Sequence, residues 1–298
     1  MRKNNKIIVI LGPTASGKTA LSITLAKRFN GEIISTDSRQ VYKGLNIGSG
    51  KITKKEMKGI PHHLLDVANP KRKFTVAQFQ TLALKKIQEI QNKGKIPFLV
   101  GGTGFYIQSV VDGIAIPEVK PNWKLRKKLD KKSVKELFLM LKKLDPRRAK
   151  NIDPKNPHRL IRAIEIVLST NKPVPKIGQR PTLPDFNILQ IGIKKSPEEL
   201  KKLIHQRLQK RLKGMIIEVK KLHQNGLSWK RLEELGLEYR FVAQYLQDKI
   251  TYQEMIDRLQ KEIEQFARRQ MTWFKRDKRI HWVRNKSEAE KLIKKFLK

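Results

Sequence analysis

The residues best suited to chemistry lie near the start of the chain, between an apolar run and a segment with helical periodicity. They read Gly-Pro-Thr-Ala-Ser-Gly-Lys-Thr and fit the phosphate-loop pattern G-x-x-x-x-G-K-[ST] in full. In such a loop the glycines let backbone N–H groups converge on phosphate oxygens, while the lysine adds charge and the last hydroxyl can bind Mg²⁺. We therefore predict a site for a ligand with two or more phosphates, formed by Gly12, Pro13, Thr14, Ala15, Ser16, Gly17, Lys18 and Thr19.

A single carboxylate follows the next apolar run. Residues 32–35 predict a short strand, and Asp37 comes directly after it. Ligand sites of parallel sheets lie at the carboxyl ends of the strands, so Asp37 should face the phosphate loop. A carboxylate there is suited to act as a general base or to orient Mg²⁺. The alternative interpretation is that Asp37 only caps the turn into Ser38.

A third apolar run is not followed by the acidic residue that nucleotide hydrolases with a phosphate loop use. Residues 96–100 predict a buried strand that runs into Gly101 and Gly102 with no Asp or Glu at its end. In ATPases and GTPases with a phosphate loop, an Asp after a later strand helps to hold Mg²⁺. The sequence therefore disfavours an ordinary nucleoside triphosphate motor.

The elements that must position these residues alternate between strands and helices. Strands are predicted over 6–11, 32–35, 96–100, 187–193 and 280–283, and the main helices over 19–29, 75–92, 197–225 and 252–276. This order predicts an α/β fold, a P-loop NTPase-like parallel sheet flanked by helices. Residues 114–186 differ, with helices over 123–129, 133–144 and 157–169 and a loop with four prolines over 171–185. We predict a catalytic core of residues 1–113 plus 187–298, interrupted by a small all-helical insertion domain.

Composition restricts the partners. The 298 residues include 66 Lys and Arg against 27 Asp and Glu, a net charge of +39 spread along the chain. The 39% hydrophobic content excludes a disordered cationic protein, and the absence of cysteine excludes disulfides and thiolate zinc sites. No apolar run is long enough to span a membrane, so we expect a cytoplasmic protein. The charge favours a polyanionic partner, although part of it is equally explained by a lysine-rich organism.

Six ordered blocks resemble one enzyme family. Residues 12–19, 33–48, 61–66, 100–106, 156–163 and 268–274 are similar in order and spacing to the tRNA dimethylallyltransferases, also called tRNA isopentenyltransferases. The resemblance implies transfer of a dimethylallyl group from dimethylallyl diphosphate to N6 of the adenosine 3′ to a tRNA anticodon, with Mg²⁺ as cofactor. It implies Asp37 as general base, with Lys18 and Thr19 acting on the leaving diphosphate and Thr19 holding the metal.

The resemblance also implies contacts with the tRNA anticodon stem-loop, some of them in the insertion. Its target adenosine must be flipped out of the loop to reach the site. The implied tRNA-binding residues are Asp37, Ser38, Arg39, Gln40, Thr103, Arg126, His158, Arg159, Leu160, Ile161, Arg162, Arg240, Arg268, Arg269, Gln270, Trp273 and Lys275.

The chain departs from the family at two places. It has Lys220 where many relatives carry an arginine, and we carry Lys220 over as a diphosphate-binding residue that keeps the charge. Residues 236–240 replace a common Ile-Gly-Tyr. Two other functions stay open from sequence: a P-loop small-molecule kinase, and an RNA-binding protein without catalytic activity. A monomer is the family expectation.

Overall fold

The computed structural model describes residues 5–117, 119–175 and 186–298. The chain divides into two compact units, which we call the core unit (residues 1–111 and 184–298) and the helical unit (residues 112–183). The predicted boundaries at 113/114 and 186/187 lie within three residues of these limits. Most of the loop predicted over residues 171–185 lies outside the described residues.

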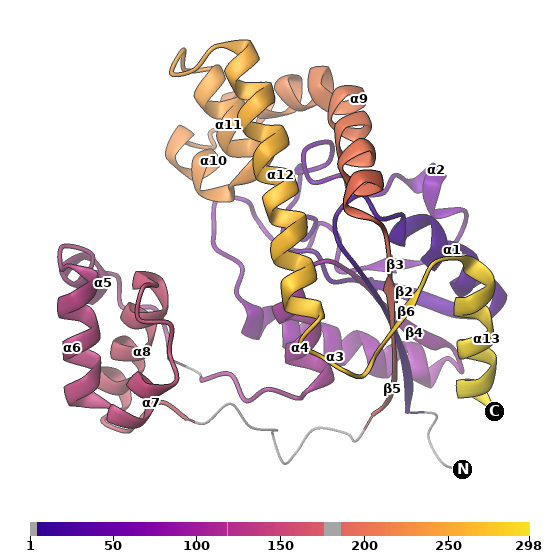
Figure 1. The fold of residues 1–298 in the computed structure, drawn as a ribbon, viewed down its shortest axis with the longest axis horizontal. Coiled ribbons are helices and arrows are strands. Elements are labelled where there is room, and N and C mark those ends of the chain that lie inside the picture. Colours follow the sequence, from indigo (N-terminus) through magenta and orange to yellow (C-terminus); the bar gives the residue numbers. More distant parts are fainter. Residues whose placement is uncertain (1–4, 118, 176–185) are drawn as a thin grey trace. The chain divides into compact units, whose positions relative to one another are not determined.

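The core unit is built on a six-stranded sheet in which every described pairing is parallel (Figure 1). Its spatial order is β3-β2-β4-β1-β5-β6, so β4 lies between β1 and β2. This arrangement confirms the predicted fold class. The strands are β1 (Lys6–Leu11), β2 (Gly31–Ser35), β3 (His62–His63), β4 (Ile96–Gly101), β5 (Asn187–Ile193) and β6 (Ile280–Val283).

Alternation along the strands gives the sheet two buried faces. Ile7 and Val9 of β1 pack with one apolar cluster, while Ile8 and Ile10 pack with the other. Because successive side chains of a strand point to opposite faces, a continuous apolar run is what a sheet covered on both sides requires.

Helices cover both faces of this sheet. The first cluster includes residues of α3, α4, α9, α11 and α12, and the second includes residues of α1 and α13. Helices α3 and α12 each begin with a capping box, at Thr75 and Thr251, which satisfies backbone N–H groups of the first turn. The helices of the core unit are α1 (Lys18–Arg28), α2 (Lys54–Met57), α3 (Val76–Asn92), α4 (Gly104–Val111), α9 (Pro197–Gln224), α10 (Trp229–Leu235), α11 (Leu237–Tyr245), α12 (Tyr252–Phe274) and α13 (Lys286–Leu297).

Four of these helices were not predicted, and α2 is one of them because it has a single turn. Helix α4 follows the glycine-rich turn after β4, where glycines mask the start of a helix. Helices α10 and α11 are short and meet at Gly236, whose φ of 76° is a left-handed backbone angle. Neither is long enough to show a clear apolar period. Among the described residues, no helix is long and apolar enough to cross a membrane.

The helical unit has a core of its own, formed by Leu137, Leu141, Leu160 and Ile164 with their neighbours. Its helices are α5 (Trp123–Leu129), α6 (Val134–Leu144), α7 (Pro146–Lys150) and α8 (Pro157–Thr170).

One buried carboxylate ties this unit together. Glu165 of α8 is 0% exposed, and it accepts two hydrogen bonds from Arg126, at 2.8 and 2.7 Å, and one from Arg162 at 2.6 Å. The backbone N–H of Asn122 donates to it at 2.7 Å. These partners keep the pKa of the Glu165 carboxyl below its usual range although burial opposes the shift. The cluster joins α8 to α5 and to Asn122, the residue directly before α5.

Replacing Glu165 with Ala should therefore destabilise the helical unit by about 3–5 kcal/mol, because two partly buried guanidinium groups lose their carboxylate. The measurement is urea unfolding of the full chain, with Glu262→Ala as control because the ion pair of Glu262 with Arg269 is long, at 3.9 Å. A loss no larger than that of the control would show that the cluster does not hold the unit together.

Candidate active site

A cavity of about 400 Å³ opens at the carboxyl ends of β1, β2 and β4. Because these strands are neighbours in a parallel sheet, the loops that follow them meet here. The structure thereby brings together residues from distant segments, as predicted. Its lining includes Thr14 to Thr19, Asp37 to Gln40, Gly101 to Thr103, Arg207, Arg211, Glu238, Ile263, Phe266 and Gln270.

The phosphate loop has the conformation that its glycines predict. Gly17 has φ 90° and Ala15 has φ 61°, so the backbone turns back before helix α1 begins at Lys18. No side chain of the described ranges caps this helix. Among the described residues, the backbone N–H groups of Gly17, Lys18 and Thr19 have no acceptor. An uncapped helix start of this kind is suited to bind an anion.

Gln270 of α12 fixes the phosphate loop from the side. The backbone N–H of Thr14 donates to Gln270 Oε1 at 2.8 Å, and Gln270 Nε2 donates to the carbonyl of Gly102 at 2.8 Å. Gln270 is only 7% exposed. The resemblance implied an RNA contact for Gln270, but both ends of its amide bind the protein. Its role in this structure is to position the loop.

Four Lys and Arg side chains of the described residues line the cavity, namely Arg39, Lys18, Arg207 and Arg211. Lys18 Nζ donates to the carbonyl of Pro13 at 2.6 Å, and Arg207 of α9 donates to Thr14 Oγ1 at 3.2 Å. Arg211 lies one helical turn after Arg207. Burial and the charge of Arg207 lower the pKa of Lys18 to about 7, against a smaller opposing effect of Asp37. Burial, followed by the charge of Arg207, lowers the pKa of Arg211 to about 10. Crowded cations of this kind are stabilised when an anion binds among them.

Sequence reasoning missed Arg207 and Arg211. Both lie on the side of α9 that also carries the buried residues Ile204, Leu208 and Met215. The sequence signal for these two residues was their spacing of four beside an apolar stripe. In a helix this rich in lysine and arginine, that spacing does not distinguish them from other basic residues.

Asp37 caps the turn that follows β2 and also lines the cavity. Its Oδ1 accepts the backbone N–H of Arg39 at 2.8 Å and that of Gln40 at 3.3 Å, which is the turn-capping arrangement. Its Oδ2 accepts no hydrogen bond from the described part of the chain, and the residue lines the cavity. Capping fixes the carboxylate and leaves one oxygen for a substrate.

The predicted neighbours of Asp37 also line the cavity, yet their side chains mostly bind protein. Thr103 Oγ1 accepts the backbone N–H of Ser38 at 3.0 Å. Arg39 Nε donates to the carbonyl of Leu235 at 2.6 Å, which joins this loop to helix α10. Gln40 accepts a hydrogen bond from Ser35 Oγ at 3.1 Å and donates to the carbonyl of Gly50 at 3.2 Å. These residues hold the wall of the cavity in place.

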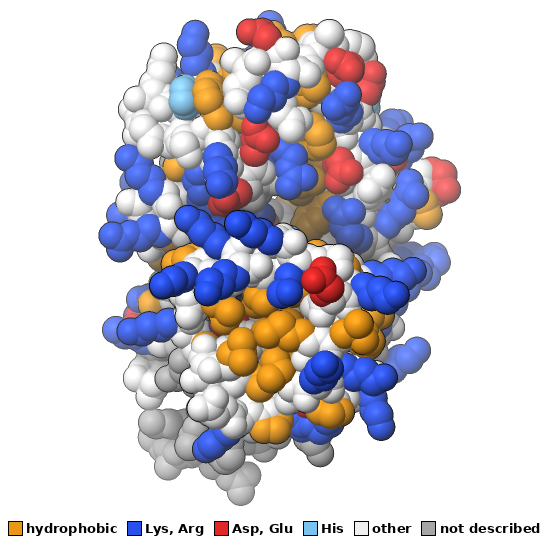
Figure 2. All heavy atoms as spheres, turned by 90° about the vertical axis from the view of Figure 1, so that its left-hand side faces the viewer, with side chains coloured by type: hydrophobic (Ala, Val, Ile, Leu, Met, Phe, Trp, Pro, Cys, Tyr) orange, Lys and Arg blue, Asp and Glu red, His pale blue; other side chains and the backbone are white. Residues whose placement is uncertain are grey.

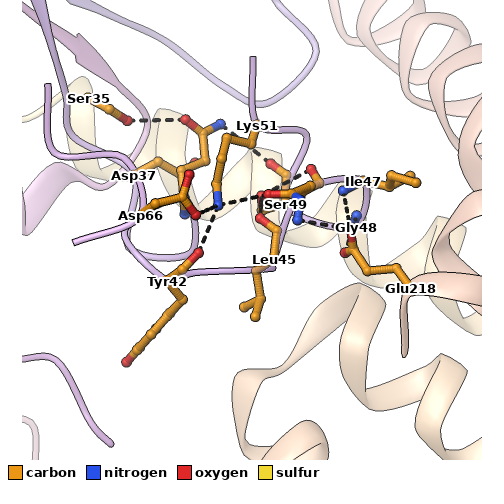
Figure 3. Close-up of polar contacts among 12 residues, drawn as sticks. Ser35, Asp37, Tyr42, Leu45, Ile47, Gly48, Ser49, Lys51, Asp66 and Glu218 are labelled. Atoms are coloured by element: carbon orange, nitrogen blue, oxygen red, sulfur yellow. Dashed lines mark hydrogen bonds and ion pairs between the residues drawn. The ribbon is translucent and has the colours of Figure 1, made fainter. Parts of the chain in front are cut away.

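A clamp on residues 46–49 completes that wall (Figure 3). Glu218 of α9 accepts backbone N–H groups from Asn46, Ile47 and Gly48 at 2.9, 2.6 and 3.1 Å. The Tyr239 hydroxyl donates to Glu218 at 2.9 Å and accepts the backbone N–H of Ser49 at 3.0 Å. The segment that includes Gly48, Ser49 and Gly50 is therefore fixed from α9 and α11.

Two further titratable groups line the cavity. Burial raises the pKa of the Glu238 carboxyl, with Arg207 and Arg211 opposing the shift and Asp37 adding to it. Burial lowers the pKa of His62. Neither was among the site residues predicted from sequence.

Several predicted residues lie away from this cavity. Lys220 is exposed on α9 and lines no part of the cavity, so its assignment to the diphosphate stays a prediction. Arg207 and Arg211 occupy the side of the helix that faces the site. Trp273 packs edge-on against Phe105 and lines a second cavity. Arg240, Arg268, Arg269 and Lys275 are exposed, whereas the predicted phosphate-loop residues Gly12 and Pro13 are buried directly before the lining begins at Thr14.

In the helical unit the predicted block 158–162 divides by helical face. Leu160 and Ile161 are 0% and 5% exposed, so their side chains belong to the unit's core and their assignment as RNA contacts stays a prediction. Arg126 and Arg162 are bound to Glu165. His158 and Arg159 are exposed at the start of α8 and remain candidates for RNA contact.

Thr19 together with a phosphorylated ligand would suit Mg²⁺. The described residues contain no cluster of three His, Asp or Glu side chains that could hold a metal. Thr19 is exposed at the start of α1, beside the free N–H groups. Mg²⁺ is commonly bound through few protein oxygens together with substrate phosphates, which matches this donor set.

Positive charge extends beyond the cavity. Figure 2 shows Lys and Arg side chains spread over the face that it presents, with Asp and Glu between them. This distribution agrees with the net charge of +39 and provides a surface for a polyanion.

The fold and site define a phosphate-loop α/β protein with a cationic cavity, and comparisons with known proteins identify the family. Residues 40–277 match the family described as IPP transferase. A tRNA dimethylallyltransferase of Anoxybacillus flavithermus is 42% identical over 280 residues, covering 93% of this chain and 89% of the relative. Another from Geotalea daltonii is 43% identical over 282 residues, covering 93% and 90%.

Solved structures agree. A full-length tRNA isopentenylpyrophosphate transferase of Bacillus halodurans has a TM-score of 0.72 at 35% identity, covering 98% of this chain and 95% of that one. A eukaryotic dimethylallyltransferase acting on tRNA has a TM-score of 0.77 at 30% identity, covering 90% and 69%. The chain belongs to the IPP transferase family, which confirms the resemblance.

The lowered pKa of Lys18 gives a testable pH dependence. Near pH 8 most Lys18 side chains are neutral in the empty cavity because their pKa is about 7, and near pH 6 most are charged. An anionic ligand favours the charged form, so binding of inorganic pyrophosphate should take up close to one proton at Lys18 near pH 8 and little near pH 6.

Calorimetry in buffers of different ionisation enthalpy measures this uptake. Lys18→Arg is the matched control, since arginine stays charged throughout. Pyrophosphate itself also takes up protons, and this contribution cancels when the uptake measured with Lys18→Arg is subtracted from that measured with wild type. Equal proton uptake by the two proteins near pH 8 would contradict the lowered pKa.

Proposed function

We propose that this protein is a tRNA dimethylallyltransferase. It transfers the dimethylallyl group of dimethylallyl diphosphate to N6 of the adenosine 3′ to the anticodon and releases diphosphate. The observation that carries the proposal is the meeting of a phosphate loop and one carboxylate, Asp37, in a single cavity, within a chain of the IPP transferase family.

The phosphate loop and its cations would bind the diphosphate of the donor. The N–H groups of Gly17, Lys18 and Thr19 are available for its oxygens, and Lys18 and Arg207 supply positive charge. When bound, Mg²⁺ held by Thr19 and the diphosphate would add charge to neutralise the leaving group. Because negative charge develops on the diphosphate as it leaves, these preorganised groups stabilise the transition state more than the ground state.

Asp37 would remove a proton from the acceptor amine. The N6 nitrogen forms a bond to the allylic carbon, the bond between that carbon and the diphosphate oxygen breaks, and one N6 proton passes to Asp37. An exocyclic adenine amine is a weak nucleophile until its proton is removed. The two backbone N–H groups that hold Oδ1 keep the carboxylate in place for this step.

The rest of the site suits a five-carbon group and a flipped base. Ile263 and Phe266 of α12 provide an apolar wall. The exposed side chains of Arg268, Arg269 and Lys275 extend from the end of the same helix and would contact RNA phosphates. Enzymes that modify a base extrude it from its stack, so the anticodon loop must open at this adenosine. We further propose that the protein acts as a monomer in the cytoplasm.

A P-loop small-molecule kinase is the alternative from sequence. Strand β4 ends in Gly101, and no Asp or Glu follows before α4 begins at Gly104. The family match also favours the transferase over the kinase.

The test is transfer of label from dimethylallyl diphosphate to an anticodon stem-loop in the presence of Mg²⁺. We expect label on the adenosine 3′ to the anticodon, as located by nuclease digestion and mass spectrometry. Absence of transfer to every tRNA tested, together with phosphorylation of a small acceptor by ATP, would reverse the assignment.

Substitution of Asp37 tests its role as base. Asp37→Asn keeps an oxygen that can accept the two backbone N–H groups but removes the basic carboxylate. We expect the stem-loop to bind with unchanged affinity while the single-turnover transfer rate falls by about 10²-fold or more. Asp248→Asn, in an exposed turn outside the cavity, is the control. A near-normal rate for Asp37→Asn would remove Asp37 from this role.

A further inference from the structure

Four residues of α9 form a stripe on one face of the helix. They are spaced by four, three and four positions, which places them on the same side of an α-helix: Arg207, Arg211, Gly214 and Glu218. Arg207 and Arg211 line the cavity, whereas Glu218 does not. The stripe therefore leads from the active site to the carboxylate that holds residues 46–49.

The segment 46–50 lies along this stripe. At one end, both carboxylate oxygens of Glu218 accept backbone N–H groups of residues 46–48 (Figure 3). One turn further along the helix, a Cβ on Gly214 would lie 2.9 Å from Ile47 Cδ1. The Ile47 side chain thus packs directly on the backbone of α9. The glycine in the helix is what allows the segment to lie this close.

The other end of the segment reaches both arginines at Gly50. A Cβ on Gly50 would lie 2.1 Å from Arg207 Nη2 and 2.2 Å from Arg211 Nη1, which is closer than packed atoms approach. Arg207 also donates to Thr14 Oγ1, but neither arginine forms an ion pair with the described part of the chain. Packing against Gly50 is therefore the contact that confines both guanidinium groups.

Confinement of the two arginines affects how tightly they bind an anion. A free arginine side chain has several rotatable bonds, and fixing them when a ligand binds costs entropy. A guanidinium that is already held in place loses less of this entropy, so the same contacts give tighter binding. Both arginines line the cavity together with the phosphate loop, where the diphosphate of the donor would bind.

We propose that Glu218 is a positioning residue for the donor site. By holding residues 46–50 along α9, it keeps Gly50 against Arg207 and Arg211 and so keeps both guanidinium groups beside the phosphate loop. This inference rests on the proposed function, in which Arg207 helps to bind the diphosphate of the donor. It adds Arg211 to the groups that bind it and gives the clamp a role in donor affinity.

Two variants break this arrangement at different points. Glu218→Gln removes the negative charge and one of the two acceptor oxygens that hold the segment. Gly50→Ala leaves the clamp intact and places a methyl group where the guanidinium groups lie. It therefore tests the same contact even if Glu218→Gln does not fold.

Each variant has a matched control. Gly94→Ala is the control for Gly50→Ala, because Gly94 has φ 69° against 61° at Gly50 but a Cβ there would meet nothing within 4 Å. Glu89→Gln on α3, a surface residue outside the lining of the cavity, is the control for Glu218→Gln.

The readout is the Kd of inorganic pyrophosphate, measured by calorimetry, together with the Kd of an anticodon stem-loop. We expect Glu218→Gln and Gly50→Ala each to raise the Kd of pyrophosphate about tenfold, as for loss of one hydrogen bond to a charged group. The stem-loop should bind as it does to wild type, and both controls should bind pyrophosphate normally. Because both variants release the same arginines, the double variant should lose less than the product of the two single losses.

An unchanged Kd for pyrophosphate in either folded variant would overturn the proposal. Losses that multiply in the double variant would show that Glu218 does not act through Gly50, and equal weakening of pyrophosphate and stem-loop binding would assign it a general structural role. Either result also overturns the proposal. Failure of wild type to transfer the prenyl group to any RNA would instead overturn the proposed function, since pyrophosphate binding is measured without that reaction.

Discussion

The parallel pairing of β2, β4 and β1 is the constraint on which the site depends. With β4 between them, the loop after β1 and the acid after β2 are two strand spacings apart, about 10 Å. Glycines at the end of β4 allow neighbouring segments to pack closely against it. A Cβ on Gly101 would lie 2.3 Å from Thr36 Oγ1 and 2.8 Å from the Thr36 backbone. A Cβ on Gly102 would lie 2.3 Å from Gln270 Nε2. The loop of Asp37 and the helix that carries Gln270 can therefore approach the end of β4 only because Gly101 and Gly102 have no side chains.

Long-range polar contacts convert this sheet edge into an organised cavity. Gln270 joins the phosphate loop to the turn after β4, and Glu218 with Tyr239 fixes residues 46–49. Arg39 joins the loop of Asp37 to α10. The contacts of Gln270, of Arg39 and of residues 46–49 each link segments that are more than 100 residues apart in sequence. The site is thus preorganised by α9 to α12, which the chain reaches only after the helical unit.

Sequence predicted the parts of the site that are local. The phosphate loop and Asp37 each lie beside one strand, so their pattern and their position at a strand end could be identified without the tertiary structure. Arg207, Arg211 and Glu238 could not, because their place in the cavity depends on how α9 and α11 pack on the sheet. The same limit applies to Lys220. Its charge is the one expected of a group that binds diphosphate, but the sequence alone could not show that it lies on the exposed side of α9. Leu160 and Ile161 were carried over as a block, and helical periodicity places them in the core.

The central claim is that the diphosphate and the acceptor base meet in this cavity. The most direct measurement is a crystal structure of the protein with inorganic pyrophosphate, Mg²⁺ and an anticodon stem-loop. We predict pyrophosphate on the N–H groups of Gly17, Lys18 and Thr19, with the flipped adenine between it and Asp37. An adenosine that stays stacked in its loop, or pyrophosphate bound away from the phosphate loop, would contradict the account.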